Sequence, residues 1–230
     1  MANQKINRKK SIVYAAEPAV CAIIRKWQDW MLIERNCSHH TLDAYSRDVS
    51  AFLIYLTEHL GFQPGINEIE GLTNIDFRGY LAMRHNSGLS HTSNARAIST
   101  LKSLYKFMDR NEILHNAAIK IIRTQKIPRS IPKPLSQHEA KEAINIIGKL
   151  HPTPWISARD LAILILLYGC GLRISEALNL NIKDLPTGDI IVINGKGKKQ
   201  RVVPILPIVN DAIKYYMSIC PQNLDKEGPL

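Results

Sequence analysis

The residues best placed to do chemistry lie just after two glycines. Arg173 follows Gly169 and Gly171, where an apolar helical stretch ends and another helix begins. Its planar guanidinium can bind two non-bridging oxygens of one phosphate, which a lysine ammonium cannot do. Glu176 comes three residues later, on the same face of the expected helix, and is placed to orient Arg173. The spacing also suits a surface ion pair, so both interpretations stay open.

A second group of candidate residues lies between two β-branched runs. The runs cover residues 189–194 and 201–205 and flank the sequence GKGKKQ at 195–200, which predicts a β-hairpin. The tip and the start of the second strand carry four cations without one acid: Lys196, Lys198, Lys199 and Arg201. A hairpin tip is also a natural place for solvated lysines, so this pattern alone leaves phosphate binding and simple solvation open.

Several enzyme classes are excluded by their missing motifs. There is no G-x-x-x-x-G-K-[ST] loop, and the G-x-G at 169–171 lacks a third glycine and follows a helix. Ser175 does not stand in a G-x-S-x-G elbow, and no histidine follows His151. The eight histidines are scattered among single carboxylates, so we expect no metal site and no cofactor.

The charge of the chain indicates a polyanionic partner. Thirty Lys and Arg residues stand against 20 Asp and Glu residues, a formal net charge of +10. Much of the excess lies in acid-free windows at 1–12, 119–135 and 195–201. Three such windows in one chain favour a surface that faces nucleic acid phosphates.

Other features of the sequence indicate where in the cell the protein is located. The longest apolar run, residues 161–168, is far shorter than a membrane span, so we expect no membrane association. The basic N-terminus has no apolar segment of the secretory type behind it. The four cysteines are far apart, as is typical of reduced thiols. Together these features predict a cytoplasmic protein.

Prolines divide the chain. Pro128, Pro132 and Pro134 lie in a basic stretch that cannot be helical and reads as a linker. We therefore expect a basic tail at 1–12, a helical domain at 13–124, a linker at 125–134 and a second domain at 135–230.

The two domains differ in their periodicity. The first predicts four amphipathic helices: 18–35, 41–60, one opening at a capping box from Thr73 to Asp76, and 95–108. The second predicts helices at 136–150, 158–169, 171–178 and 209–219 around the hairpin, with the 158–169 helix buried on all sides. The expected fold is mainly α, with a small α+β part.

Five segments carry a resemblance to a known family. YGCGLRISEAL at 168–178 and NGKGKKQRVVPI at 194–205 resemble the first arginine motif and the lysine hairpin of tyrosine recombinases, the phage-integrase family. Residues 38–53 and 95–107 resemble helices of that family's DNA-clamping domain, and IPRSIPKPL at 127–135 is typical of its linker. The combination is similar to the Xer branch, the bacterial chromosome-dimer resolvases.

The resemblance implies a fold and an activity. The fold is a four-helix SAM-like core-binding domain followed by an α+β catalytic domain, which is incomplete here. The activity is site-specific DNA recombination through a 3′-phosphotyrosine, without a cofactor because the covalent intermediate conserves the bond energy. Arg173 matches the family arginine that neutralises the pentacoordinate phosphate, and Glu176 matches the supporting acid. Lys196 matches the family lysine that protonates the leaving 5′-oxygen.

The resemblance also implies DNA contacts and partners. The candidate DNA-binding residues are Lys198, Lys199, Arg201, Arg129, Lys133, Arg96 and Lys102. The implied partner is double-stranded DNA, bound by a homo- or hetero-tetramer that includes a second recombinase.

One departure from the family pattern is serious. The family also needs a later His-x-x-Arg, a further His or Trp, and a nucleophilic tyrosine, and the sequence ends at Leu230 without them. Tyr215 and Tyr216 are interpreted as packing residues. The expectation is a chain that binds DNA and does not cleave it. The alternatives are a non-catalytic DNA-binding or regulatory protein and an RNA-binding protein that uses the same basic surfaces.

Overall fold

The computed structural model describes residues 12–123, 133–185, 188–195, 200–222, 225 and 227–230. The chain divides into two compact units, Met1–Ser130 and Ile131–Leu230, hereafter unit 1 and unit 2. Most of the predicted linker at 125–134 lies outside the described residues. No helix within the described ranges is both long and apolar enough to cross a bilayer.

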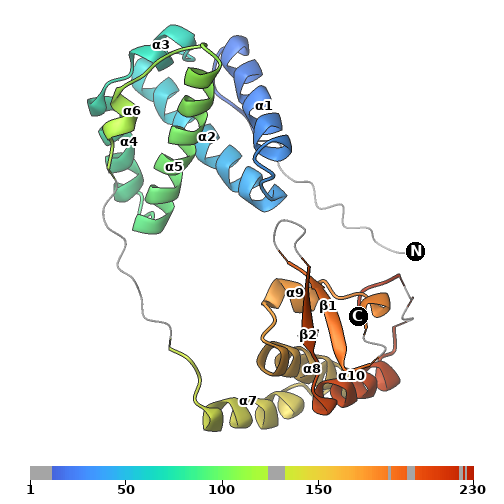
Figure 1. Ribbon diagram of the computed structural model, residues 1–230. Coiled ribbons are helices and arrows are strands. Elements are labelled where there is room, and N and C mark those ends of the chain that lie inside the picture. The colour runs from blue at the N-terminus through green and yellow to red at the C-terminus, as the bar shows by residue number, and fades with distance from the viewer. Residues whose placement is uncertain (1–11, 124–132, 186–187, 196–199, 223–224, 226) are drawn as a thin grey trace, which may run out of the picture. The chain divides into compact units, whose positions relative to one another are not determined.

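Unit 1 is entirely helical in its described part (Figure 1). The four predicted helices are confirmed, and two short ones were not predicted because six and four residues are too few to show a periodic pattern. The helices are α1 (Pro18–Ile33), α2 (His39–Leu60), α3 (Ile66–Gly71), α4 (Asn74–Asn86), α5 (His91–Arg110) and α6 (Ala118–Ile121).

The helix ends follow from local sequence. The Ser38 hydroxyl accepts a hydrogen bond from the backbone N–H of Thr41 and so begins α2. Gly61 ends the same helix with φ = 84°, a left-handed conformation that favours glycine. The predicted capping box is present at α4, where the Asp76 carboxylate accepts from the backbone N–H of Thr73 at 2.7 Å.

Helix α5 organises the core of unit 1, because it packs against α1, α2 and α4. Aromatic side chains fill the centre, as predicted: Trp27, Phe77 and Tyr80 have no exposed surface, and Phe52 is 2% exposed. The Phe52 ring lies 5.0 Å from the Tyr80 ring in an edge-on arrangement. The packed core therefore holds α2 and α5 at a fixed separation, with charged side chains between the two helices.

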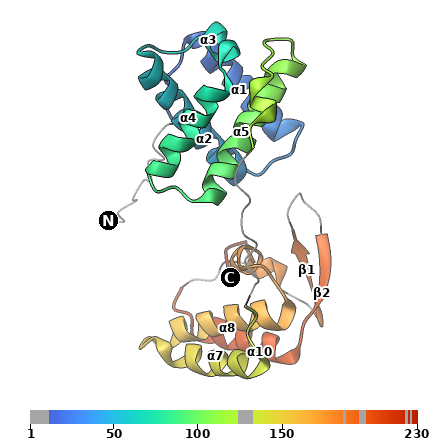
Figure 2. The same cartoon turned by 90° about the vertical axis from the view of Figure 1, so that its left-hand side faces the viewer.

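Unit 2 consists of helices around one β-hairpin. Its elements are α7 (Gln137–Leu150), α8 (Pro154–Cys170), α9 (Ile174–Leu178), a 3₁₀ turn (Ile182–Asp184), β1 (Ile190–Asn194), β2 (Gln200–Pro204) and α10 (Pro207–Ile219). Helix α8 packs against both α7 and α10 (Figure 2). The prediction that this helix is buried on all sides is wrong: within 158–169 most residues are only half-buried, and Tyr168 is 54% exposed.

The predicted hairpin is confirmed. Strands β1 and β2 pair antiparallel, with Val192 opposite Val202 and Asn194 opposite Gln200. Side chains alternate across the two strands, so that Ile191, Ile193 and Val203 join the core while their neighbours face outward.

Candidate nucleic-acid interface

The turn between α8 and α9 positions Arg173. Helix α8 ends at Cys170, and Gly171 follows with φ = 60°, again in the left-handed region. The next side chain, Leu172, is buried and holds the turn against the core of unit 2. Arg173 then precedes α9 in an extended conformation, and its side chain is 70% exposed. The turn therefore combines a rigid backbone with a guanidinium that faces solvent.

Glu176 is the centre of the cluster around Arg173. Its side chain is only 5% exposed, and it accepts four hydrogen bonds, each 2.8 Å long. One comes from the backbone N–H of Arg173, one from Nη1 of the same residue, and two from Nη1 and Nη2 of Arg201. This carboxylate is a buried bridge rather than a member of a surface ion pair. It occupies one edge of the Arg173 guanidinium and leaves the rest exposed.

The hydrogen bonds keep Glu176 ionised. The Arg201 guanidinium, followed by the backbone N–H of Arg173, lowers the pKa of Glu176 from its ordinary value of 4.5 to about 2. The same contact raises the pKa of Arg201. Two guanidinium groups around one carboxylate leave a net charge of +1, and the exposed Arg173 carries it to the surface. The arrangement is suited to binding an anionic oxygen.

The hairpin is tied to the Arg173 turn through Arg201. This residue lies in β2 opposite Ile193, directly after the predicted lysine tip. Lys196, Lys198 and Lys199 lie outside the described residues, as does Arg129 in the linker. Asn194 and Gln200 pair across the two strands, and the side-chain amide of Gln200 donates to Oδ1 of Asn194 at 3.1 Å.

Arg201 makes a contact that the sequence did not indicate. It was predicted to contact the DNA backbone, but both of its terminal nitrogens are engaged by Glu176, 25 residues away. The prediction of a DNA contact stays open, and the observed contact is a structural one. A pairing over this separation leaves no periodic pattern in the sequence from which it can be recognised.

The DNA-binding candidates of unit 1 also have partners within the protein. Lys102 donates from Nζ to the backbone carbonyls of Ile122 (2.8 Å) and Lys120 (3.4 Å), at the C-terminal end of α6. Arg96 is bound by Asp48. In unit 2, Lys133 is exposed.

A groove in unit 1 contains further cations that were not predicted as DNA-binding residues from the sequence. It has a volume of about 550 Å³, and its lining includes Trp30, Arg35, Tyr45, Lys102, Lys106 and Arg110. Glu34 also lines the groove and accepts a hydrogen bond from the Trp30 indole at 2.9 Å. The signal that could have found this surface is the spacing of Lys102, Lys106 and Arg110, which places them on one face of α5.

The two tyrosines after the hairpin differ. Tyr216 is 6% exposed and packs in the core of unit 2, and burial raises its pKa to about 12. The interpretation as a packing residue is confirmed for Tyr216, whereas it is wrong for Tyr215, which is 56% exposed on the outer face of α10. Elsewhere in the described residues, no three His, Cys, Asp or Glu side chains lie close enough to hold a metal ion.

The comparisons with known proteins agree with this architecture. Residues 24–112 match the family described as "Phage integrase, N-terminal SAM-like domain", and residues 133–228 match "Phage integrase family". The tyrosine recombinase XerC of Mesorhizobium japonicum is 41% identical over 217 residues, which cover 94% of this chain and 70% of that protein. The XerC of Rhodospirillum centenum is 38% identical over 221 residues, covering 96% of this chain and 65% of that protein.

Solved structures show the same fold. A XerH site-specific recombinase bound to its difH substrate matches with a TM-score of 0.62 at 20% identity, covering 90% of this chain and 63% of that one. A lambda integrase tetramer bound to a Holliday junction matches with a TM-score of 0.63 at 15% identity, covering 92% and 61%.

A SAM-like helical unit followed by a helical unit with an arginine turn and a hairpin defines a tyrosine recombinase, and the chain belongs to the phage integrase family. Within that family, the two relatives described above are both XerC proteins. The chain spans about two thirds of their length.

Proposed function

We propose that this protein acts in site-specific recombination of double-stranded DNA, as a recombinase of the XerC type. The observation that carries the proposal is the cluster in which Glu176 holds the exposed Arg173 in place, within the segment that matches the integrase family. The reaction is DNA cleavage and rejoining through a 3′-phosphotyrosine. The role in the cell is the resolution of chromosome dimers at cell division, in the cytoplasm where the chromosome lies.

Each residue of the cluster has a proposed role. Arg173 donates to the non-bridging oxygens of the scissile phosphate and neutralises the charge that develops in the pentacoordinate transition state. Glu176 keeps the guanidinium in one orientation, so that little rearrangement is needed when the phosphate arrives. Arg201 keeps Glu176 ionised and joins the hairpin to the turn. Lys196 protonates the departing 5′-oxygen.

DNA binding itself rests on many weaker contacts. Lys198, Lys199, Arg129, Lys133 and the basic groove of unit 1 provide cations for backbone phosphates, consistent with the net charge of +10. The proposed assembly is a tetramer on DNA that includes a second recombinase. Its support is the tetrameric lambda integrase, whose fold this chain shares.

The test compares the full chain with Arg173→Ala in two assays. The first measures affinity for duplex DNA, with duplex RNA as competitor. The second measures formation of a covalent protein–DNA adduct on a nicked recombination site. We expect Arg173→Ala to bind the duplex almost as tightly as the unchanged chain, because Arg173 acts mainly on the charge that develops in the transition state and ground-state affinity comes from many other phosphates.

Three outcomes separate the candidate functions. An adduct that requires Arg173 supports the recombinase. Duplex DNA binding without an adduct favours the non-catalytic DNA-binding alternative. Displacement of DNA by an equal concentration of duplex RNA contradicts the proposal.

A further inference from the structure

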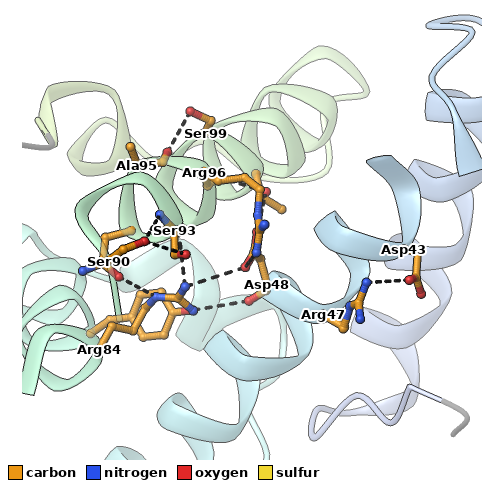
Figure 3. Close-up of polar contacts among 12 residues, drawn as sticks. Asp43, Arg47, Asp48, Arg84, Ser90, Ser93, Ala95, Arg96 and Ser99 are labelled. Atoms are coloured by element: carbon orange, nitrogen blue, oxygen red, sulfur yellow. Dashed lines mark hydrogen bonds and ion pairs between the residues drawn. The ribbon is translucent and has the colours of Figure 1, made fainter. Parts of the chain in front are cut away.

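Unit 1 contains a buried carboxylate that the proposed reaction does not use. Asp48, on α2, has a side chain that is 3% exposed. Arg96 on α5 donates to it twice, from Nε to Oδ2 at 2.8 Å and from Nη2 to Oδ1 at 3.2 Å. The hydroxyl of Thr100, one turn further along α5, shares its proton between Oδ2 at 3.3 Å and the backbone carbonyl of Arg96 at 3.0 Å. Figure 3 shows the carboxylate between the two helices.

A second arginine approaches Asp48 from α4. The side chain of Arg84 is 6% exposed, and its Nη2 lies 3.8 Å from Oδ1 of Asp48. Its other nitrogens are engaged inside the unit: Nε donates to Asn94 at 2.9 Å and Nη1 to the Tyr80 hydroxyl at 3.1 Å. Arg84 therefore compensates the charge of Asp48 and is not available to a ligand.

Arg96 differs from Arg84 in its exposure. Its side chain is 47% exposed, although Asp48 holds it along the Nε–Nη2 edge. In the described part of unit 1, its contacts leave Nη1 without a partner. The pKa of Arg96 is raised by the hydrogen bonds to Asp48, so the group stays charged. With two guanidinium groups and one carboxylate, the cluster has a net charge of +1 that is carried outward by Arg96.

The arrangement repeats the one around Arg173. In each unit a carboxylate that is at most 5% exposed lies between two arginines, of which at least one is substantially exposed. A guanidinium that is already held loses less rotamer freedom when it binds an anion than a mobile side chain does. Lys102, Lys106 and Arg110 lie further along the same helix, so a polyanion bound at Arg96 has other cations of α5 nearby in the sequence of the helix.

We propose that Arg96 is a preorganised phosphate-binding arginine of unit 1, and that Asp48 is the positioning residue that presents it to the DNA backbone. The inference rests on the proposed DNA function and adds to it a specific anchor in the helical unit. Lys106 and Arg110 then provide diffuse attraction, whereas Arg96 fixes where unit 1 lies along the DNA.

The first experiment separates a held arginine from an ordinary cation. The affinity of the full chain for duplex DNA is measured by fluorescence anisotropy between about 50 and 200 mM salt. Arg96→Ala is expected to lower affinity about tenfold, as loss of one charge-assisted hydrogen bond does. The slope of log K against log[salt] falls by about 0.9, the value for one phosphate contact.

The lysine variants provide the matched control. Arg96→Lys is expected to lose nearly as much affinity as Arg96→Ala, because an ammonium cannot bind Asp48 along one edge and a phosphate along another. Arg78 lies on α4 of the same unit, outside the groove, is exposed and has no ion pair within the described residues. Arg78→Lys should therefore bind like the unchanged chain.

The positioning role is tested with Thr100→Val, which removes the hydrogen bonds of the hydroxyl to Asp48 and to the Arg96 carbonyl while preserving the shape of the side chain. It is expected to lower affinity about two- to threefold in the unchanged chain and to have no effect in the Arg96→Ala background. An equal loss in both backgrounds, or full affinity in Arg96→Lys, overturns the inference. Absence of duplex binding by the unchanged chain overturns the proposed function instead.

Discussion

The charged cluster of unit 1 makes a strong prediction about stability. Asp48 and Asp43 both lie on α2 and both pair with an arginine, but only Asp48 is buried (Figure 3). Replacing Asp48 by alanine leaves the buried Arg84 without its counter-charge. The same substitution at Asp43 removes an exposed pair with Arg47, in which the side chains are 39% and 64% exposed.

The two substitutions should differ several-fold in free energy of unfolding. Removing one partner of a buried ion pair costs about 3–5 kcal/mol. Removing one partner of an exposed pair costs about 0–1 kcal/mol. For a dependence on urea of about 2 kcal/mol per molar, Asp48→Ala should lower the unfolding midpoint by about 1.5–2.5 M, while Asp43→Ala shifts it by less than about 0.5 M.

Tryptophan fluorescence provides an assay specific for unit 1. The chain has three tryptophans, of which Trp27 and Trp30 are in unit 1 and Trp155 is in unit 2. A Trp155→Phe background leaves only the unit 1 signals, and Trp27 is fully buried there. Both substitutions introduce the same residue into the same helix, so differences in helix propensity cancel. Equal midpoint shifts for Asp48→Ala and Asp43→Ala would refute the reasoning.

Three further predictions concern single groups. The pKa of Glu176 in the folded state is depressed from 4.5 to about 2, so its contribution to stability is present above about pH 4.5 and is lost as the pH falls toward 2. The urea concentration at the unfolding midpoint, measured as a function of pH, should therefore fall less steeply over this window in Glu176→Gln than in the unchanged chain. Gly171→Ala places a Cβ in open space on a residue with φ = 60°, so backbone strain alone should lower the free energy of unfolding by about 1 kcal/mol. Gly71→Ala, at the end of α3, should leave the free energy of unfolding unchanged in the same urea assay. Ser38→Ala removes the N-cap of α2 and should destabilise unit 1 by about 1 kcal/mol in urea unfolding; no change would mean that another group caps the helix.

Local patterns in the sequence were sufficient for the elements but not for the charge clusters. The long helices and the hairpin were predicted because apolar periodicity and turn residues act over a few positions. A pairing of Glu176 with Arg173 was expected in both open interpretations, because residues three apart on a helix are neighbours. Arg201 was not recognised as the second partner, because its approach depends on how the hairpin packs on α9.

The cluster in unit 1 could have been suspected from one feature. Asp48 falls on the apolar face of α2, between Tyr45, Val49 and Phe52, where an uncompensated carboxylate would be costly. That position indicates a buried partner, but it does not say which one. Arg84 and Arg96 are 36 and 48 residues away, and their convergence follows only from the packing of α4 and α5 on α2.

The central claim is that Glu176 holds Arg173 ready for one DNA phosphate. The most direct measurement is a structure of the full chain bound to duplex DNA. In that structure we expect the Arg173 nitrogens to lie about 2.7–2.9 Å from the non-bridging oxygens of a single phosphate, while the contact with Glu176 persists. An Arg173 side chain that points to solvent while the DNA binds elsewhere would contradict the central claim.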